Sequence, residues 1–414
     1  MSEQSNATAS RTDEFIAQAD RWSAHNYHPL DVVVTRGEGC YVWDVDGNRY
    51  LDCLAAYSAV NQGHCHPRIV GALTDQAKRL TLTSRAFHND RMGVFLEQLC
   101  NTLGYERALP MNTGAEGVET ALKTARKWGY KVKGVAPDAA EIIVMDGNFH
   151  GRTTTIVSFS TDEQARDGFG PFTPGFKVVP YGDADAVRAA MTPNTVAVLV
   201  EPIQGEGGVV LPPNGFLAAV AEACRESNAL FIGDEVQTGL GRTGKLLACD
   251  WEDVRPDVLI LGKALGGGVY PVSAVLADSA IMDVFHPGDH GSTFGGNPLA
   301  AAVGAEALSV LIDEGLVDQA RELGDWFVEQ LRAIDSPHVE LVRGRGLMVG
   351  VVIKESSGPA RPFCKALKRC GILAKETHEQ VIRFAPPLVI TREILEGVLP
   401  DIAAVLRGEG VELG

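Results

Sequence analysis

Between about residues 75 and 300, short apolar runs alternate with amphipathic helical patterns, and this alternation restricts the fold more than any other feature of the chain. Five of the runs have the length of a buried strand: EIIVMD, VAVLVEP, ALFIGDE, VLILGK and VSAVLA. Helical periodicity lies between them, in ETALKTARKWGYKV and GFLAAVAEACRES. Because strands joined through helices favour parallel pairing, this pattern predicts an α/β fold with a mostly parallel, doubly wound sheet.

The segments on either side have a different pattern. GEGCYVWDVDGNRYLD alternates apolar and polar residues around the turn signal Asp46-Gly47, which predicts short N-terminal strands. Beyond about residue 300 we expect a long helix, a strand pair near VELVRGRGLMVGVVI, another helix and a strand around VIRFAPP. The predicted organisation is therefore a large domain over residues 75–305 and a small α+β domain, formed by an N-terminal arm (1–74) and the C-terminal segment (306–414).

Composition restricts the ligand and the compartment. The 414 residues carry a formal net charge of −16, which repels nucleic acid and anionic membrane surfaces and favours a small anionic ligand. MSEQSNATASRTDEF has the character of neither a secretory signal nor a transit peptide, and no apolar run is long enough to span a membrane. The eight cysteines form no C-x-x-C pair and lie mostly in apolar segments, so we expect reduced thiols and a cytoplasmic protein.

The stretch FIGDEVQTGLGRTGKL fits one nucleotide-binding pattern and nearly fits another. Gly239, Gly241 and Gly244 match G-x-G-x-x-G, but five residues separate the strand from the first glycine and no clear helix follows. Leu246 stands where a P-loop needs a hydroxyl for magnesium. We therefore expect a tight structural turn, with Lys245 as a loop cation.

Asp234 and Lys263 each stand where a buried strand ends, and ligands of open α/β sheets bind at that edge. Lys263 lies within the apolar, glycine-rich stretch LILGKALGGGVYPVSA, and a buried lysine is rare unless it is paired or used covalently. A turn carboxylate and a structural salt bridge are the simpler alternatives. Together the two residues suggest pyridoxal phosphate, whose aldehyde the lysine binds as a Schiff base while the acid keeps the pyridine nitrogen protonated.

Three further segments supply groups that suit this cofactor. In MNTGAEGVETALKTARKWGY, Gly114 and Ala115 begin a helical pattern whose free amides can receive a phosphate. GNFHGRT offers Phe149 to stack on a ring and Arg152 to clamp a carboxylate. GSTFGGNP offers Ser292 and Thr293 as further phosphate donors. Helix capping, core packing and surface exposure would explain each of these residues singly.

Taken together, the segments resemble the class-III, fold-type I pyridoxal-phosphate-dependent aminotransferases, in the subgroup that contains the ornithine, acetylornithine and 4-aminobutyrate enzymes. The resemblance covers nearly the whole chain. Within the subgroup the chain is most similar to the ornithine enzymes, in the segments HNYHPLDVV, YSAVNQGHCHP, LTLTSRAF, PMNTG, DGFGPFTPGF, EPIQGEGGVV, DEVQTGLGRTG, LGKALGGGVYPVSAV, HGSTFGGNP and VIRFAPPLVI. It implies ping-pong transfer of the δ-amino group of L-ornithine to 2-oxoglutarate. The products would be glutamate and glutamate 5-semialdehyde, which cyclises to pyrroline-5-carboxylate.

The resemblance also implies a role for each matching residue. Lys263 would be the Schiff-base lysine and Asp234 the partner of the pyridinium nitrogen. The remaining cofactor contacts would come from Gln237 to the phenolic oxygen, Phe149 to the ring, and Gly114 and Ala115 to the phosphate. In this family the residue matching Thr293 completes the phosphate site of the other subunit, which implies a homodimer with shared active sites.

Substrate residues are carried over in the same way. Tyr27 and Arg152 would hold the distal end of the substrate, with Tyr57 lining the pocket. Glu206 would pair with Arg383 while ornithine is bound and release it to grip the α-carboxylate of 2-oxoglutarate. This amounts to a charge switch, because an arginine already paired to a glutamate cannot clamp a carboxylate.

One departure leaves the substrate open. The animal ornithine enzymes carry tryptophan where this chain has His150, and histidine is the form of the acetylornithine and 4-aminobutyrate relatives. Those two ω-aminotransferase activities remain the alternatives, and a pyridoxal-phosphate-dependent aminomutase is a more distant one. We expect no metal site at His64-Cys65-His66, because three adjacent side chains alternate in direction and do not converge on one ion.

Overall fold

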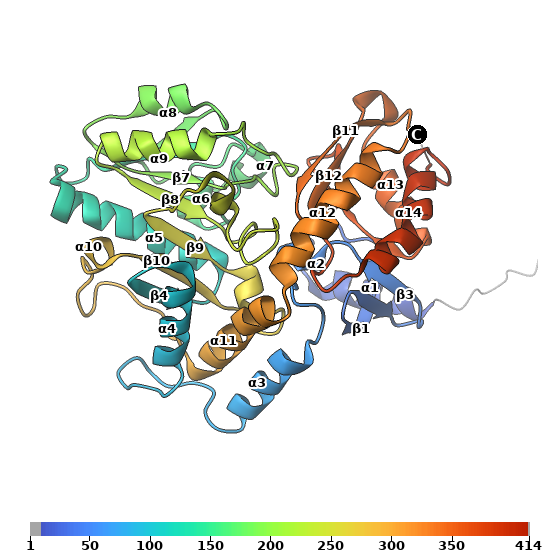
Figure 1. Ribbon diagram of the computed structural model, residues 1–414, viewed down its shortest axis with the longest axis horizontal. Helices are drawn as coiled ribbons and strands as arrows, with labels where there is room; N and C mark the ends of the chain where they lie inside the picture. Colours follow the sequence, from blue (N-terminus) through green and yellow to red (C-terminus); the bar gives the residue numbers. More distant parts are fainter. Residues whose placement is uncertain (1–9, 413–414) are drawn as a thin grey trace, which may run out of the picture.

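The computed structural model describes residues 10–412, so residues 1–9 of the predicted N-terminal arm lie outside the described range. The chain forms two lobes that lie side by side, with the long helix α12 (Leu316–Arg332) between them (Figure 1). A seven-stranded sheet forms the centre of one lobe, and two four-stranded sheets belong to the other. The fold is therefore the predicted one: a large α/β lobe with a parallel-rich sheet and a smaller α+β lobe.

The large sheet confirms the strand assignments made from the apolar runs. Within it only β10 runs antiparallel to its neighbours, while the other contacts are parallel. Two further strands, β4 and β6, were not predicted, because their burial is incomplete and their apolar runs are short. In sheet order the strands are β4 (Arg107–Met111), β10 (Ser273–Ala277), β9 (Val258–Leu261), β8 (Leu230–Asp234), β7 (Thr195–Val200), β5 (Glu141–Met145) and β6 (Phe176–Val179).

Helices cover both faces of this sheet, as the two-residue period of its strands requires. Ile142 and Val144 of β5 pack in the cluster that contains the apolar side of α5 (Gly114–Trp128). Ile143 and Met145 point the other way, into the cluster that contains α9 (Phe216–Glu226). Both helices were predicted from their periodicity. The remaining helices are α1 (Arg11–Trp22), α2 (Ala55–Ser58), α3 (Pro67–Ala77), α4 (Met92–Leu103), α6 (Thr154–Val157), α7 (Glu163–Arg166), α8 (Ala184–Ala190), α10 (Ser279–Met282), α11 (Pro298–Asp313), α13 (Arg361–Arg369) and α14 (Arg392–Leu406).

The smaller lobe joins the two ends of the chain. One sheet is antiparallel throughout and has the order β11 (Val339–Arg345), β12 (Met348–Ile353), β15 (Val381–Phe384) and β14 (Lys375–Thr377). The other contains the predicted N-terminal strands β1 (Val34–Glu38), β2 (Tyr41–Asp44) and β3 (Arg49–Asp52), and β13 (Ile372–Leu373) pairs in parallel with β3. The predicted domain boundaries, residues 74 and 305, lie inside the helices α3 and α11 and do not coincide with the end of an element. The division of the chain at these residues remains a prediction.

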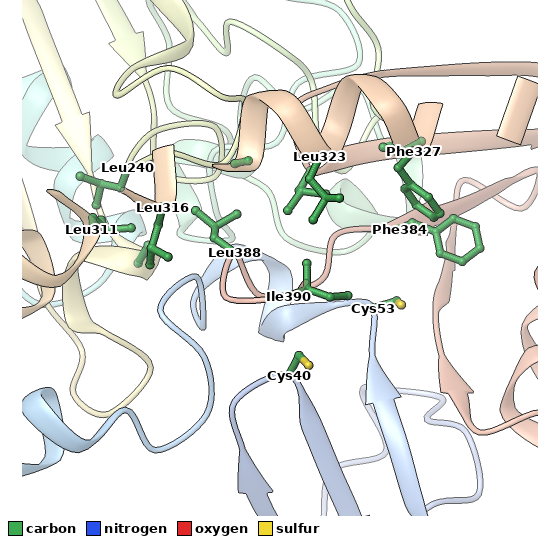
Figure 2. Close-up of a cluster of buried hydrophobic side chains, with 14 of the residues drawn as sticks. Cys40, Cys53, Leu240, Leu311, Leu316, Leu323, Phe327, Phe384, Leu388 and Ile390 are labelled. Atoms are coloured by element: carbon green, nitrogen blue, oxygen red, sulfur yellow. The ribbon is translucent and has the colours of Figure 1, made fainter. Parts of the chain in front are cut away.

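A continuous apolar core connects the lobes (Figure 2). Leu240 and Leu311 lie at its large-lobe end, and Phe384 lies at its small-lobe end. Side chains of α12 bridge them, among them Leu316, Leu323 and Phe327. Because one hydrophobic cluster spans both lobes, separating them would expose the apolar faces of both.

The glycine-rich loop after β8 forms a joint between the lobes, and it has the predicted tight turn: the amide of Leu240 donates to the carbonyl of Leu246 at 2.7 Å. Arg242, in this loop, is fully buried and donates to the carbonyls of Leu347 and Pro386, and to Asn61 Oδ1 at 2.5 Å. At Gly346 a Cβ would lie 2.3 Å from the Thr243 backbone, so the two backbones meet where only glycine fits.

The two histidines of the HCH run have separate partners. His64 Nε2 lies 2.8 Å from Asp52, and His66 Nε2 lies 3.2 Å from Glu314. Residues 10–412 hold no group of three or more His, Cys, Asp or Glu side chains suited to a metal ion. In the same range no helix combines the length and the apolar character needed to cross a bilayer.

Candidate active site

The carboxyl edge of the large sheet holds a cavity of ≈ 180 Å³. Asp234 is the last residue of β8, and Lys263 follows the neighbouring parallel strand β9 with a φ of 43°, in the left-handed region. Both line the cavity, as expected for residues at the ends of adjacent parallel strands. The other lining residues are Gly114, Ala115, Phe149, His150, Gly151, Glu201, Ile203, Val236, Gln237 and Thr238.

Asp234 is tightly held at the floor of the cavity. It is 5% exposed, and its Oδ2 lies 2.6 Å from Nδ1 of the buried His150. Burial lowers the pKa of His150, but the hydrogen bond to Asp234 and the charges of Asp234 and Glu201 outweigh it and raise that pKa overall. The Asp234 carboxylate thus points into the cavity with one oxygen bound to an imidazole that favours its protonated form.

Lys263 has the electrostatic surroundings of a reactive amine. Burial lowers the pKa of its ammonium; the Glu206 carboxylate opposes that shift, and the Arg383 guanidinium adds to it. Among residues 10–412, the groups that shift this pKa act through burial and charge, and none does so through a hydrogen bond to Nζ. The amine is therefore free to react with a ligand in the cavity, and its neutral form is easier to reach than that of a surface lysine.

The N-terminus of α5 presents free backbone donors to the same cavity. Thr113 caps the helix, with its Oγ1 accepting from the Glu116 amide at 3.2 Å while Glu116 accepts from the Thr113 amide at 2.8 Å. The next two amides, of Gly114 and Ala115, have no acceptor among the described residues. Two unpaired donors at the positive end of a 15-residue helix form an anion site.

These groups match the parts of pyridoxal phosphate. An amine for its aldehyde comes from Lys263, and a carboxylate for its pyridine nitrogen comes from Asp234. An aromatic face comes from Phe149, and the α5 amides provide donors for the phosphate. The residues of the cavity therefore fit the cofactor that the sequence suggested.

Beside the cavity lies a pair of opposite charges. Arg383, on β15 and 1% exposed, donates from Nη1 to Glu206 Oε1 at 2.7 Å and lies over the Tyr57 ring at 5.1 Å. Gln237 also donates to Glu206, at 3.2 Å. Burial acts to raise the pKa of Glu206, but the charges of Arg383 and Lys263 and the hydrogen bonds from Arg383 and Gln237 together lower it. The lowered pKa favours the ionised form of Glu206 within this pair.

Two other predicted substrate residues meet at the surface. Arg152 Nη1 lies 3.3 Å from the Tyr27 hydroxyl, and its guanidinium lies 5.4 Å from the ring of Phe149, which lines the cavity. Tyr57 stands on a short turn in which four consecutive residues, 55–58, have positive φ values. Such a run in non-glycine residues stores backbone strain, a feature concentrated at functional sites.

Ser292 and Thr293 do not line this cavity within the described chain. Ser292 Oγ accepts from Asn112 Nδ2 at 2.8 Å, just before α5, and Thr293 is exposed. Their predicted role in holding phosphate stays a prediction, and for Thr293 it concerns the site of a second subunit.

Sequence reasoning missed the roles of two ionisable residues of the cavity. His150 was treated only as a marker of substrate preference, although it contacts Asp234 directly. Glu201 was overlooked, although it follows the fully buried strand β7 as Asp234 ends β8. The rule that identified Asp234, a carboxylate at the end of a buried strand, would have identified Glu201 as well.

Comparison with known proteins agrees with this site. The sequence pattern of the family described as "Aminotransferase class-III" matches residues 22–406. The ornithine aminotransferase of Brevibacillus brevis is 57% identical over 398 residues, which cover 96% of this chain and 99% of that protein. The structure of the ornithine aminotransferase from Toxoplasma gondii matches with a TM-score of 0.95 at 48% identity, covering 96% of this chain and 94% of that one.

An acetylornithine aminotransferase from Elizabethkingia anophelis also matches, with a TM-score of 0.88 at 49% identity, covering 96% of this chain and 99% of that one. The family match, the relatives and the geometry of the cavity agree on one conclusion. The chain belongs to the class-III aminotransferases, enzymes that use pyridoxal phosphate.

Proposed function

We propose that this enzyme transfers the δ-amino group of L-ornithine to 2-oxoglutarate. The products are glutamate and glutamate 5-semialdehyde, which cyclises to pyrroline-5-carboxylate. The ornithine aminotransferases that match 96% of the chain support this substrate. The structural observation that carries the proposal is the Glu206–Arg383 pair, because the reaction needs two different ways of receiving a carboxylate.

In the ornithine half-reaction the terminal amine has to reach the cofactor while the α-carboxylate stays far from it. Pairing at 2.7 Å neutralises Arg383, so the neighbourhood of Lys263 does not attract the α-carboxylate. Tyr27 and Arg152 receive the distal end of the substrate instead. In the second half-reaction Arg383 leaves Glu206 and binds the α-carboxylate of 2-oxoglutarate, which brings the keto carbon to the reacting position.

When bound, pyridoxal phosphate supplies the aldehyde that accepts the amino group and the ring that takes up electrons from the substrate carbon. Lys263 moves the proton at that carbon, since burial lowers the pKa of its ammonium and makes the neutral amine available. Asp234, fixed by its bond to His150, holds the proton on the pyridine nitrogen. Gln237, which lines the cavity, would donate to the phenolic oxygen of the cofactor, and the amides of Gly114 and Ala115 would hold its phosphate.

We also propose a cytoplasmic homodimer with shared active sites. Thr293 precedes Phe294, a large apolar side chain that is 47% exposed. The segment around Phe87, which is 69% exposed, lies against the same region, since Asn89 donates to the Gly296 carbonyl at 3.3 Å. An exposed apolar area next to Thr293 supports an interface at which this hydroxyl completes the phosphate site of the partner.

Mixed dimers test the shared site. One subunit carries Lys263→Ala and the other Thr293→Ala. If Thr293 acts across the interface, one of the two sites contains both intact residues, so mixing restores cofactor affinity and activity to about half the wild-type value. Activity of about half that of the Thr293→Ala homodimer would show that the hydroxyl acts within its own chain, because only one site would then retain Lys263.

N-acetylornithine or 4-aminobutyrate is the second candidate substrate. His150 and the 49% identity to an acetylornithine aminotransferase favour it. The deciding experiment adds L-ornithine, N-acetylornithine or 4-aminobutyrate to the holoenzyme without an oxo acid and follows the visible absorbance of the bound cofactor. Ornithine should bleach the band fastest, and Lys263→Ala should show no turnover. Faster bleaching by either other amine would overturn the ornithine assignment.

A further inference from the structure

Glu201 is a buried carboxylate of the cavity to which the proposed reaction assigns no task. It is 7% exposed and forms no salt bridge with a lysine or arginine among the described residues. Burying an ionised carboxylate without such a partner costs free energy. We therefore expect the Glu201 side chain to have a function in the cavity.

The side chain of Glu201 contacts the segment that carries Phe149, the predicted ring-stacking residue, and His150, the partner of Asp234. Glu201 Oε2 accepts from the Phe149 amide at 2.9 Å, immediately before His150. The charged or titratable groups that act on Glu201 are His150, Asp234 and Lys263, and Tyr181 donates to its backbone carbonyl at 3.2 Å. Within this group only His150 both touches Asp234 and can change its charge near neutral pH.

His150 has one ring nitrogen that can change its protonation in response to the charge of Glu201. Its Nδ1 is committed to Asp234 at 2.6 Å, while its buried Nε2 has no partner among the described residues. The imidazole can therefore gain or lose the proton on Nε2 without breaking the bond to Asp234. Two states hold one proton between them: ionised Glu201 with a charged His150, or neutral Glu201 with a neutral His150.

We propose that Glu201 is a positioning residue of the transamination site, which sets the charge of His150 and through it the strength with which Asp234 holds the pyridine nitrogen of the cofactor. The inference rests on the proposed role of Asp234. Burial raises the pKa of Glu201 to about 7, although the charge of His150 acts to lower it, so close to physiological pH the carboxyl gains the negative charge that favours a charged His150. A purely structural acceptor for the Phe149 amide would not need to ionise.

Glu201→Gln separates the two roles, because the amide oxygen still accepts from Phe149 but carries no charge. The primary readout is the far-downfield proton resonance of the short His150 Nδ1–H···Asp234 bond in the holoenzyme, assigned by its loss in His150→Asn and followed against pH. With the negative charge gone, the imidazolium is less favoured, and the titration midpoint should fall by about one pH unit or more. Glu201→Asp, which keeps a carboxylate, should restore most of the shift.

Glu235→Gln is the matched control. Glu235 is also buried and follows Asp234 directly, but it accepts from Thr238 and from the Cys249 amide at 2.8 Å and does not line the cavity. It should leave the His150 midpoint unchanged. A midpoint in Glu201→Gln that equals the wild type, or one shifted equally by Glu235→Gln, would overturn the proposal.

A reciprocal measurement does not depend on the folding of Glu201→Gln. In His150→Asn the side-chain carboxyl ¹³C resonance of Glu201 should titrate at higher pH than in the wild type, because coupling between two sites is mutual. An unchanged carboxyl midpoint would refute the coupling. Both titrations are made without an amino substrate, so they can fail while the ornithine assignment stands, and the reverse also holds.

Discussion

Glu206→Gln perturbs the substrate switch while changing little else in the site. The carboxylate accepts from Arg383 at 2.7 Å and from Gln237 at 3.2 Å, and a glutamine oxygen can still accept from both. A hydrogen bond to a charged group contributes about 1.5–3 kcal/mol, and we take the loss of the Glu206 charge to remove roughly half of that. Opening the pair should therefore become easier by about 0.75–1.5 kcal/mol, which corresponds to a factor of about 4–13.

The assay compares single-turnover half-reactions with ornithine and with glutamate, followed by the visible absorbance of the cofactor. In Glu206→Gln, Arg383 is available to carboxylates at lower cost, so the glutamate reaction should gain on the ornithine reaction by about 4–13-fold in kcat/KM. The KM for 2-oxoglutarate should fall in the same direction.

Glu376→Gln provides the matched control, since Glu376 accepts from Arg361 at 2.6 Å on the edge strand β14 and does not line the cavity. Its selectivity should equal that of the wild type. If Glu206→Gln also kept the wild-type ratio of glutamate to ornithine, the switch would be refuted even with both activities intact.

Three further changes test the stability of the fold. Arg242→Met leaves the Leu347 and Pro386 carbonyls and Asn61 without their donor. We expect the free energy of thermal or denaturant unfolding to fall by about 3 kcal/mol. Part of the loss is offset because methionine buries no charge, whereas burial of the Arg242 charge is unfavourable and lowers its pKa to about 9. A wild-type melting temperature would contradict the role of the joint. Thr113→Ala removes the cap of α5 and should cost about 1 kcal/mol, whereas Thr113→Ser should not. Glu201 has a folded pKa of about 7 against an ordinary 4.5, so the folded state binds more protons between these values, and this stabilisation is lost as pH rises from 4.5 to 7. The free energy of unfolding of the cofactor-free protein, measured in urea, should therefore fall less between pH 4.5 and 7 in Glu201→Gln than in the wild type. If both proteins lost the same stability over this range, the raised pKa of Glu201 would be contradicted.

The sequence predicted those elements whose signal is local. Buried strands such as β7 and β8 are continuous apolar runs, and Asp234 and Lys263 stand out because a charge follows such a run. The strand β6 was missed because its residues are only partly buried and so lack that contrast. The contact between His150 and Asp234 joins positions 84 residues apart and could not be read from either segment alone. The roles of Glu206 and Arg383 came from resemblance, since nothing in their spacing indicates that they pair.

The pairing of β3 with β13 has a consequence for synthesis of the protein. About 320 residues separate Asp52 from Ile372, and a ribosome adding 5–20 residues per second needs roughly 16–64 s to make them. During that interval the edge of β3 and the buried side chains Leu51 and Cys53 have neither their neighbouring strand nor their core. The N-terminal hairpin therefore keeps an unpaired strand edge until the C-terminal segment has been made, and such an edge is a site at which other chains can pair.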